Sequence, residues 1–272
     1  MTPMLMSSVV MAALFAASPA PKTQPLTWKV TGSDVTFEMS SKDLRALRDG
    51  KEVFGFQSRK KGFLEDVTPA EDEERDTSDW EALWAFDVRS VVGPWVSYEE
   101  ANSGYTGGAH PYAHFSYVTV DVTKPQGKFS LLDVFPEKDV LAALKADGFV
   151  KKHIGDAEAF KKARTVEAML ETLEPGEDCV GFRYGLDSVK RSVAFHHLEG
   201  GKVAVRIAFP YDNESCRGNM FVVGVLLPIP ASLKPVLERA SSRQEGFLMK
   251  DAKTVKAPSI RFEWEGAESK KP

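Results

Sequence analysis

Residues 112–122 read YAHFSYVTVDV, and this stretch alternates regularly between two kinds of position. The odd positions from 115 to 121 carry Phe, Tyr, Thr and Asp, and the even positions from 116 to 122 carry Ser and three Val. A period of two is typical of a β-strand whose two faces have different surroundings. We therefore predict a strand here, which the Lys-Pro-Gln-Gly sequence at 124–127 turns back.

The segments before this strand also indicate β-structure. Residues 80–98 are rich in aromatic and β-branched side chains, which predicts paired strands broken or bulged at Gly93-Pro94. Residues 26–30 and 34–39 alternate around Gly32-Ser33 and predict a β-hairpin. The pattern of residues 44–56 does not decide between helix and strand.

The segments after it predict helices and then more strands. Two helices are expected within residues 136–149 and 156–173, the second with Asp156 as its N-cap. A hairpin over 189–196 and 202–209 should turn at Gly200-Gly201. Further predictions follow in chain order: a fully buried strand at 220–228, a short helix within 230–239 and a strand-like piece at 260–264.

This order of elements predicts an α+β fold with antiparallel sheets, a central helical segment and two subdomains. We divide the chain into a signal peptide at 1–20, an N-terminal α+β subdomain at 22–127, a C-terminal α+β subdomain at 128–240 and a polar tail at 241–272.

The composition is that of a soluble globular protein. The chain has 272 residues, of which 43% are hydrophobic and 27% charged, and its net charge of −4 argues against a general nucleic-acid binder. The almost wholly apolar run at 4–17 is too short to span a bilayer, so we predict a signal peptide, no transmembrane span and a secreted or periplasmic protein. The alternative for this run is a buried N-terminal helix.

Cys179 and Cys216 are the two cysteines, and both lie in polar, turn-rich sequence. In an oxidising compartment we expect them to form a disulfide, with two free thiols as the alternative. A metal site at either is not expected, because neither has a second Cys or a His at ligand spacing.

An acidic stretch at 65–81 holds nine carboxylates and one arginine, a net charge of −8. Such a run is usually a solvated loop, but it also suits a surface that docks a cationic partner. A weak calcium site is a third possibility, although the Asp/Asn spacing and Gly of an EF-hand loop are missing. The residues proposed for an acidic surface are Glu71, Asp72, Glu73, Glu74 and Asp76.

The histidines do not form a recognisable catalytic or metal-binding pattern. His110 and His114 lie on a predicted strand, where four residues span about 13 Å, too far for one metal ion. His196 and His197 are adjacent, so on a strand they should face opposite ways, and His153 is expected at a helix C-terminus. We predict no metal site, no cofactor and no catalytic residues.

The most unusual segment is the YTGGAHP sequence at 105–111. Its paired glycines can adopt positive φ and expose successive backbone N–H groups, which favours a recognition loop. The alternative is a tight turn that only leads into the next strand. The candidate ligand-binding residues are Tyr105, Thr106, Gly107, Gly108, His110 and Pro111.

The YTGGAHP sequence closely resembles the signature of an extracytoplasmic domain family of unknown function. The family includes the outer part of RsiV-type anti-sigma factors and the N-terminal region of PdaC-type peptidoglycan deacetylases. The flanking sequences at 91–99, 120–122, 128–135 and 211–228 are also similar to it, so the resemblance covers about residues 26–240.

This resemblance implies an α+β fold with two subdomains that meet near residue 127, and a location in the cell envelope. In the RsiV-type relatives the region binds lysozyme, and no catalytic residues are implied for the region itself.

We therefore expect a non-enzymatic, sensor-like binding domain that recognises a cell-envelope component, such as a part of the cell wall, or a cationic protein such as lysozyme. One alternative is an envelope hydrolase that uses His110 with a carboxylate such as Asp121, and another is a structural module of a larger assembly.

Overall fold

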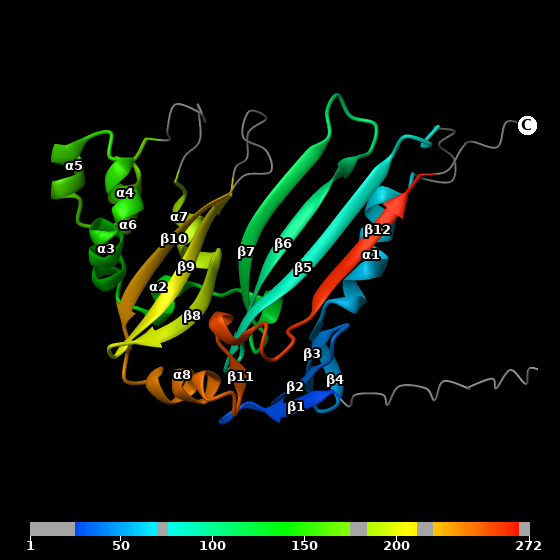
Figure 1. Ribbon diagram of the computed structural model, residues 1–272, viewed down its shortest axis with the longest axis horizontal. Coiled ribbons are helices and arrows are strands. Elements are labelled where there is room, and N and C mark those ends of the chain that lie inside the picture. Colours follow the sequence, from blue (N-terminus) through cyan, green and yellow to red (C-terminus); the bar gives the residue numbers. More distant parts are fainter. Residues whose placement is uncertain (1–24, 70–75, 175–183, 211–219, 267–272) are drawn as a thin grey trace, which may run out of the picture.

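The computed structural model describes residues 25–69, 76–174, 184–210 and 220–266 (Figure 1). Within these ranges the strands form three antiparallel sheets, and a group of short helices separates the second sheet from the third along the chain. This arrangement confirms the predicted α+β fold with antiparallel sheets and a central helical segment.

The described strands are β1 (Leu26–Lys29), β2 (Val35–Met39), β3 (Leu44–Arg48), β4 (Lys51–Gly55), β5 (Glu81–Val92), β6 (Trp95–Tyr105), β7 (Tyr112–Asp121), β8 (Val193–Glu199), β9 (Lys202–Pro210), β10 (Met220–Pro228), β11 (Gly246–Phe247) and β12 (Ser259–Glu265). The described helices are α1 (Lys60–Val67), α2 (Leu131–Val134), α3 (Glu137–Ala146), α4 (Gly148–Lys152), α5 (Ala157–Lys162), α6 (Val166–Leu170), α7 (Leu186–Arg191) and α8 (Lys234–Ser241), with short 3-10 turns at Gln57–Arg59, Pro125–Gly127 and Met249–Asp251.

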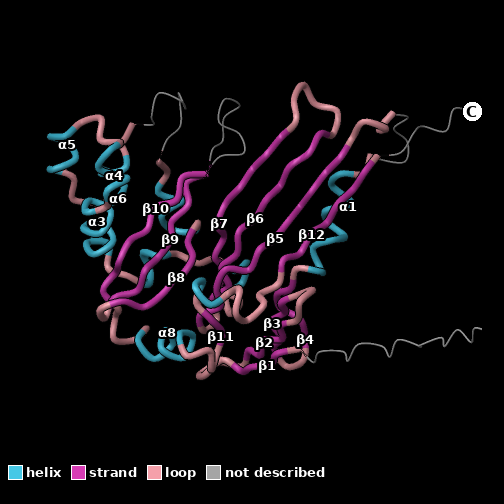
Figure 2. Tube along the Cα trace, viewed as in Figure 1, coloured by secondary structure: helices cyan, strands magenta, loops and turns pink. Residues whose placement is uncertain are grey.

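The central sheet has the strand order β11-β5-β6-β7, and β12 also pairs with β5. The N-terminal sheet has the order β1-β2-β3-β4, and the C-terminal sheet has the order β10-β9-β8. Figure 2 shows the long strands of the central sheet running side by side, with the loop between β6 and β7 projecting beyond the rest of that sheet.

Tight glycine turns set the registers of the hairpins. Gly200 and Gly201 both have positive φ, as the predicted hairpin between β8 and β9 requires. Asp49 and Gly50 also both have positive φ, so the undecided segment 44–56 is the hairpin of β3 and β4. The Asp-Gly pair is a strong hairpin signal.

Two large hydrophobic clusters form most of the described core. One lies between a face of the central sheet, the N-terminal sheet and α1, and includes Phe37, Phe56 and Phe86, all fully buried. The other lies between the C-terminal sheet and the helices, and includes Leu144 and Phe195. The first draws its residues from 28–122 and from 247–262, and the second mostly from 129–248.

The last residues of the chain return to the central sheet. Ile260 and Phe262 are only 3% exposed because β12 pairs with the first half of β5, and Phe247 of β11 is also buried. The strand expected at 260–264 is therefore confirmed. The predicted polar tail is wrong as a description of residues 246–265, since these strands contribute to the core.

Three sequence predictions differ from the structure in detail. The helix expected over 156–173 is broken, because Thr165 caps a new helix, α6, through its hydroxyl. Residues 186–191 form α7, so the hairpin strand begins only at Val193. Strand β10 is not fully buried: it is an edge strand with alternating exposure, and Leu226 is 40% exposed.

A candidate binding surface at the tip of the central sheet

The YTGGAHP turn joins β6 to β7 at one end of the central sheet, which we call the tip. A Cβ atom on Gly107 would lie 2.4 Å from the ring of Trp80, and its φ is +82°. Gly107 therefore lets the backbone close over the indole in a conformation that other residues rarely adopt. Gly108 does not have positive φ, so only one of the paired glycines behaves as the sequence analysis expected.

The other candidate residues of the turn differ in exposure. Tyr105 and Thr106 are half-buried, whereas Gly107, Gly108, His110 and Pro111 are exposed. The same turn thus has a packed side, against Trp80, and an open side that a partner can reach.

His110 and Asp121 lie at opposite ends of β7. At about 3.3 Å per residue, this ten-residue strand spans about 30 Å. The proposed His110–Asp121 catalytic pair is therefore wrong, because the two groups are far beyond hydrogen-bond reach. Asp121 instead is buried, and it accepts hydrogen bonds from the N–H of Thr123 at 3.0 Å and from Trp95 Nε1 at 3.3 Å.

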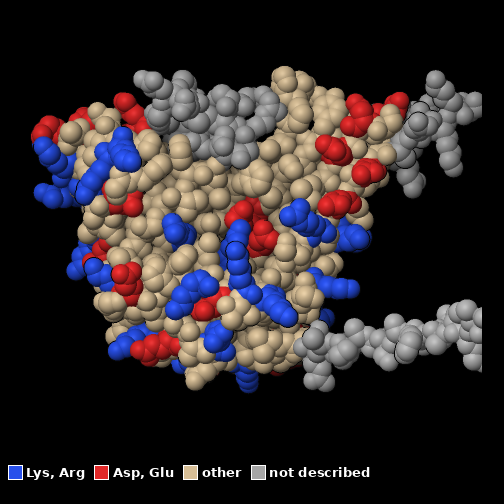
Figure 3. All heavy atoms as spheres, in the orientation of Figure 1, with Lys and Arg blue, Asp and Glu red and all other residues tan. Residues whose placement is uncertain are grey.

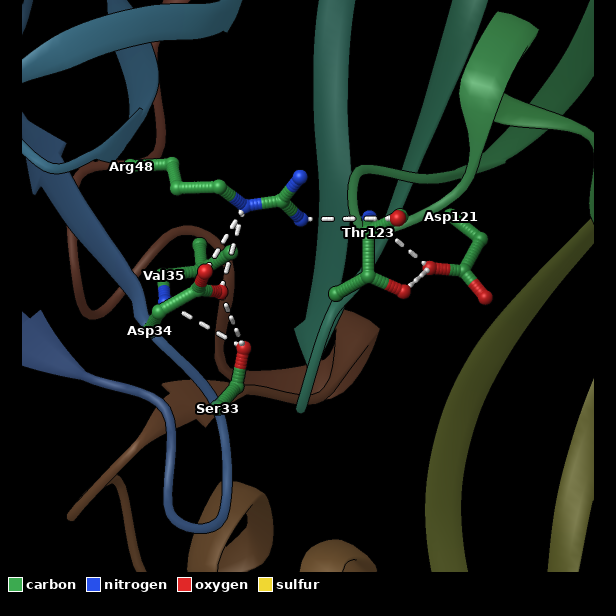
Figure 4. A network of polar contacts seen from close by, with 6 residues as sticks. All are labelled: Ser33, Asp34, Val35, Arg48, Asp121 and Thr123. Atoms are coloured by element: carbon green, nitrogen blue, oxygen red, sulfur yellow. Dashed lines mark hydrogen bonds and ion pairs between the residues drawn. The ribbon is translucent and has the colours of Figure 1, made fainter.

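The Asp121 end of the sheet, which we call the base, is tied to the N-terminal sheet. Arg48 forms an ion pair with Asp34 at 3.1 Å and donates a hydrogen bond to the carbonyl of Thr123 (Figure 4). The neighbouring recess of about 970 Å³ is widely open and is lined mainly by residues 29–34 of the β1–β2 hairpin. The contacts at the base connect the N-terminal sheet to the central sheet, so they stabilise the fold.

The tip carries most of the described part of the acidic stretch. Glu81 pairs with Tyr105 and with Glu265 across the sheet, and the backbone carbonyl of Trp80 accepts a hydrogen bond from Gly266. These contacts bring the segment 76–81, the end of β12 and the turn together. The exposed carboxylates gathered there are Asp66, Asp76, Asp79, Glu81, Glu263 and Glu265, and we call this set the acidic tip.

The surface view shows the same grouping. In Figure 3, Asp and Glu side chains gather at the upper right, over the ends of β5 and β12 that Figure 1 labels. The backbone N–H of Ser78 donates to Asp76 and lowers the pKa of that carboxyl, which keeps it charged. Glu71, Asp72, Glu73 and Glu74 lie outside the described residues.

Two recesses flank the turn. The larger, about 410 Å³, is lined by Glu81, Glu263 and Glu265 together with Leu83, Ser103 and Pro111. The smaller, about 200 Å³, lies between α1 and the sheet and is lined by Phe63, Trp84, Tyr112, Asp66, Val67, Asn102 and Thr106. Acidic and aromatic side chains thus surround the YTGGAHP turn.

The remaining histidines lie elsewhere. His153 is the C-cap residue of α4, as predicted, and its Nδ1 lies 2.9 Å from the carbonyl of Phe149. The prediction that His196 and His197 face opposite ways is wrong, because their Nδ1 atoms are 2.8 Å apart. A bulge in β8 between Phe195 and His197 breaks the two-residue period and brings the rings together.

Some predictions lie outside the described residues, namely the signal peptide at 1–20 and both cysteines, Cys179 and Cys216. In the part of the chain that the structure describes, no helix is long and apolar enough to cross a membrane. The same part contains no group of three or more His, Cys, Asp or Glu side chains suited to holding a metal ion.

Comparison of the chain with protein-family models, with curated proteins and with solved structures finds no match in any of the three.

Proposed function

We propose that this protein is an exported, non-enzymatic binding domain that captures a cationic protein, such as lysozyme, on the acidic tip. The observation that carries the proposal is the convergence of the YTGGAHP turn with exposed carboxylates from α1, the segment before β5, and β12. These carboxylates come from three separate parts of the chain: Glu81, Glu263 and Glu265 line one recess beside the turn, and Asp66 of α1 lines the other.

Electrostatics supports a cationic partner. Opposite charges across an interface accelerate association and select the partner, and exposed pairs contribute about 0.2–1 kcal/mol each. The resemblance of the turn to a family whose RsiV-type members bind lysozyme points to the same chemistry. Half-buried Tyr105 and Trp80 add apolar area beside the charges, as binding surfaces commonly do.

Lysozyme binding is tested by titrating the immobilised full chain at two ionic strengths. At about 0.01 M and about 1 M the Debye length is about 30 Å and about 3 Å, so the affinity should fall strongly at the higher salt. The absence of binding at low salt, or binding that salt leaves unchanged, contradicts the proposal.

A matched pair of triple variants locates the surface. The tip variant Glu81→Gln/Glu263→Gln/Glu265→Gln should weaken lysozyme binding about tenfold, since three exposed pairs of about 0.5 kcal/mol sum to that factor. The control variant Glu158→Gln/Glu167→Gln/Glu171→Gln makes the same charge change on the exposed side of α5 and α6. Equal losses in the two variants would assign the effect to net charge and not to the tip.

Export is part of the same proposal, because a lysozyme-binding domain must meet its partner outside the cytoplasm. The apolar run at 4–17 and the two cysteines support it. Fractionation of cells that produce the full chain should place the mature protein outside the cytoplasm, with a new N-terminus near residue 20. Cytoplasmic retention with residue 1 intact would overturn this part.

A further inference from the structure

The chain already holds one of its own cations in a box of aromatic rings. The guanidinium carbon of Arg59 lies 5.2–5.3 Å from four ring centroids, and Nη1 donates a hydrogen bond of 3.0 Å to the hydroxyl of Tyr98. The four rings belong to Phe54, Phe56, Phe86 and Tyr98. Ring faces carry negative partial charge, so this box stabilises a guanidinium beside the core.

A second aromatic recess begins two residues earlier along β5, on the same face of the sheet. Trp84 packs against Phe86 with ring centroids 4.8 Å apart, and Phe63 of α1 lies 6.2 Å from Trp84. The rings of Trp84, Phe63 and Tyr112 line the cavity of about 200 Å³ described above. The first box and this cavity are therefore neighbours, joined through the contact between Phe86 and Trp84.

The polar groups of the cavity favour a cation over an anion. Asp66 lines it from α1, and Thr106 lines it from the YTGGAHP turn. Trp84 Nε1 donates a hydrogen bond of 2.6 Å to Glu100, which fixes the indole and places a further carboxylate beside it. Burial raises the pKa of Tyr112, so its ring stays a neutral phenol.

We infer that this cavity receives the guanidinium of an arginine side chain on the partner protein, between the rings of Trp84 and Tyr112 and beside the carboxylate of Asp66. The inference rests on the proposed function, because it names the group by which a cationic protein is anchored at the tip. An arginine plane can stack on an aromatic face while its charged N–H groups donate to a carboxylate; a neutral side chain makes the same contacts without the charge, and an anionic one is repelled.

A small probe tests the cavity without any partner protein. The ¹⁵N-labelled full chain is titrated with N-acetyl-arginine amide and, separately, with N-acetyl-citrulline amide, which has nearly the same shape but no charge. The readout is the indole N–H resonance of Trp84, assigned with the Trp84→Phe variant. The arginine probe should shift this resonance in a saturable way, and the citrulline probe should bind at least fivefold more weakly.

Asp66→Asn removes the charge while keeping the size of the side chain, and it should weaken the arginine probe about threefold to tenfold. Asp66 is exposed on α1, so the substitution leaves the core untouched. Glu65→Gln is the matched control, since Glu65 is the adjacent exposed carboxylate but does not line the cavity. Equal binding of the two probes, or no effect of Asp66→Asn, overturns the inference.

The outcomes separate this inference from the proposed function. If lysozyme binds the acidic tip with salt-sensitive affinity while the arginine probe does not shift Trp84, the proposed function stands and the cavity assignment fails. If the arginine probe binds as described but lysozyme does not, the cavity assignment stands and lysozyme is excluded as the partner.

Discussion

The two ends of the central sheet differ in how far their polar side chains are buried, although the same strands run between them. At the base, Asp121 is 4% exposed and its carboxylate is surrounded by donors from Thr123 and Trp95. At the tip, His110 and Pro111 are exposed, and carboxylates gather around two recesses. Polar side chains of the same sheet are therefore buried and hydrogen-bonded at one end and exposed at the other.

The largest effect is expected from a change that breaks the base. Asp121→Asn should lower the free energy of unfolding by about 2 kcal/mol, because it removes a buried charge-assisted acceptor and directs an amide N–H₂ group toward donors. Urea denaturation of the variant and the wild type measures the difference. A loss below about 0.5 kcal/mol would show that the hydrogen bonds of Asp121 do not stabilise the base.

One residue of the tip, Gly107, is held in a tightly packed backbone conformation, and its substitution tests that packing. Gly107→Val should cost about 1–2 kcal/mol, because a side chain at φ +82° is strained and would meet the ring of Trp80. The control is Gly108→Ala, for which the nearest atom is 3.8 Å away and φ is not positive. Equal stability changes in the two variants would contradict the structure of the turn.

A second contact near the base is sensitive to pH. Glu245 accepts hydrogen bonds from the N–H and the hydroxyl of Thr31 and pairs with Arg239 at 3.1 Å. Partial burial alone would raise the pKa of Glu245, but these contacts outweigh it and lower the pKa below its usual value.

Because the folded-state pKa lies below the unfolded one, the contribution of Glu245 is fully present above about pH 4.3 and is lost as pH falls through the folded-state value. Glu245→Gln should therefore cost about 1 kcal/mol at pH 7 and much less at about pH 3. Denaturation curves of both proteins at the two pH values measure this. A variant that loses as much stability at acidic pH as at neutral pH would exclude the charge as the cause.

The smallest effect is expected at the exposed end of the turn. His110→Ala should change the free energy of unfolding by less than about 0.5 kcal/mol, because an exposed side chain outside the packed contacts contributes little. Thermal unfolding of His110→Ala and of Asp121→Asn, measured side by side with the wild type, compares the two ends of the sheet directly. A loss similar to that of the base variant would remove the distinction between the two ends.

Much of the fold follows from local signals that the sequence displays. Residues 112–122 alternate, and β7 occupies Tyr112–Asp121 with Tyr117, Thr119 and Asp121 buried. The hairpin turns at Gly32-Ser33 and Gly200-Gly201 were predictable, because tight turns need residues that tolerate positive φ.

Other elements depend on contacts that no local pattern reports. The stretch 156–173 has one apolar stripe but forms two short helices. The hydroxyl of Thr165 caps the N-terminus of α6, and this local hydrogen bond competes with a continuous helix. The bulge in β8 is equally invisible in the sequence, and it reverses the expected separation of His196 and His197.

The candidate site divides in the same way. The turn motif identified Tyr105–Pro111, and the charge count identified the acidic stretch, but the sequence did not indicate Trp84, Tyr112, Glu263 or Glu265 as neighbours of the turn. A signal did exist at residues 260–264, where the predicted strand contained an exposed acidic position, but its place beside β5 could not be foreseen.

The sequence by itself determined which segments become strands and turns, because alternation and glycine conformation act over a few neighbouring residues. Only the tertiary structure decided that α1, the start of β5 and the end of β12 meet at the YTGGAHP turn, and that Asp121 lies at the opposite end from His110. Those placements depend on pairing between residues far apart in the chain, whose partners are chosen by the packing of the whole core.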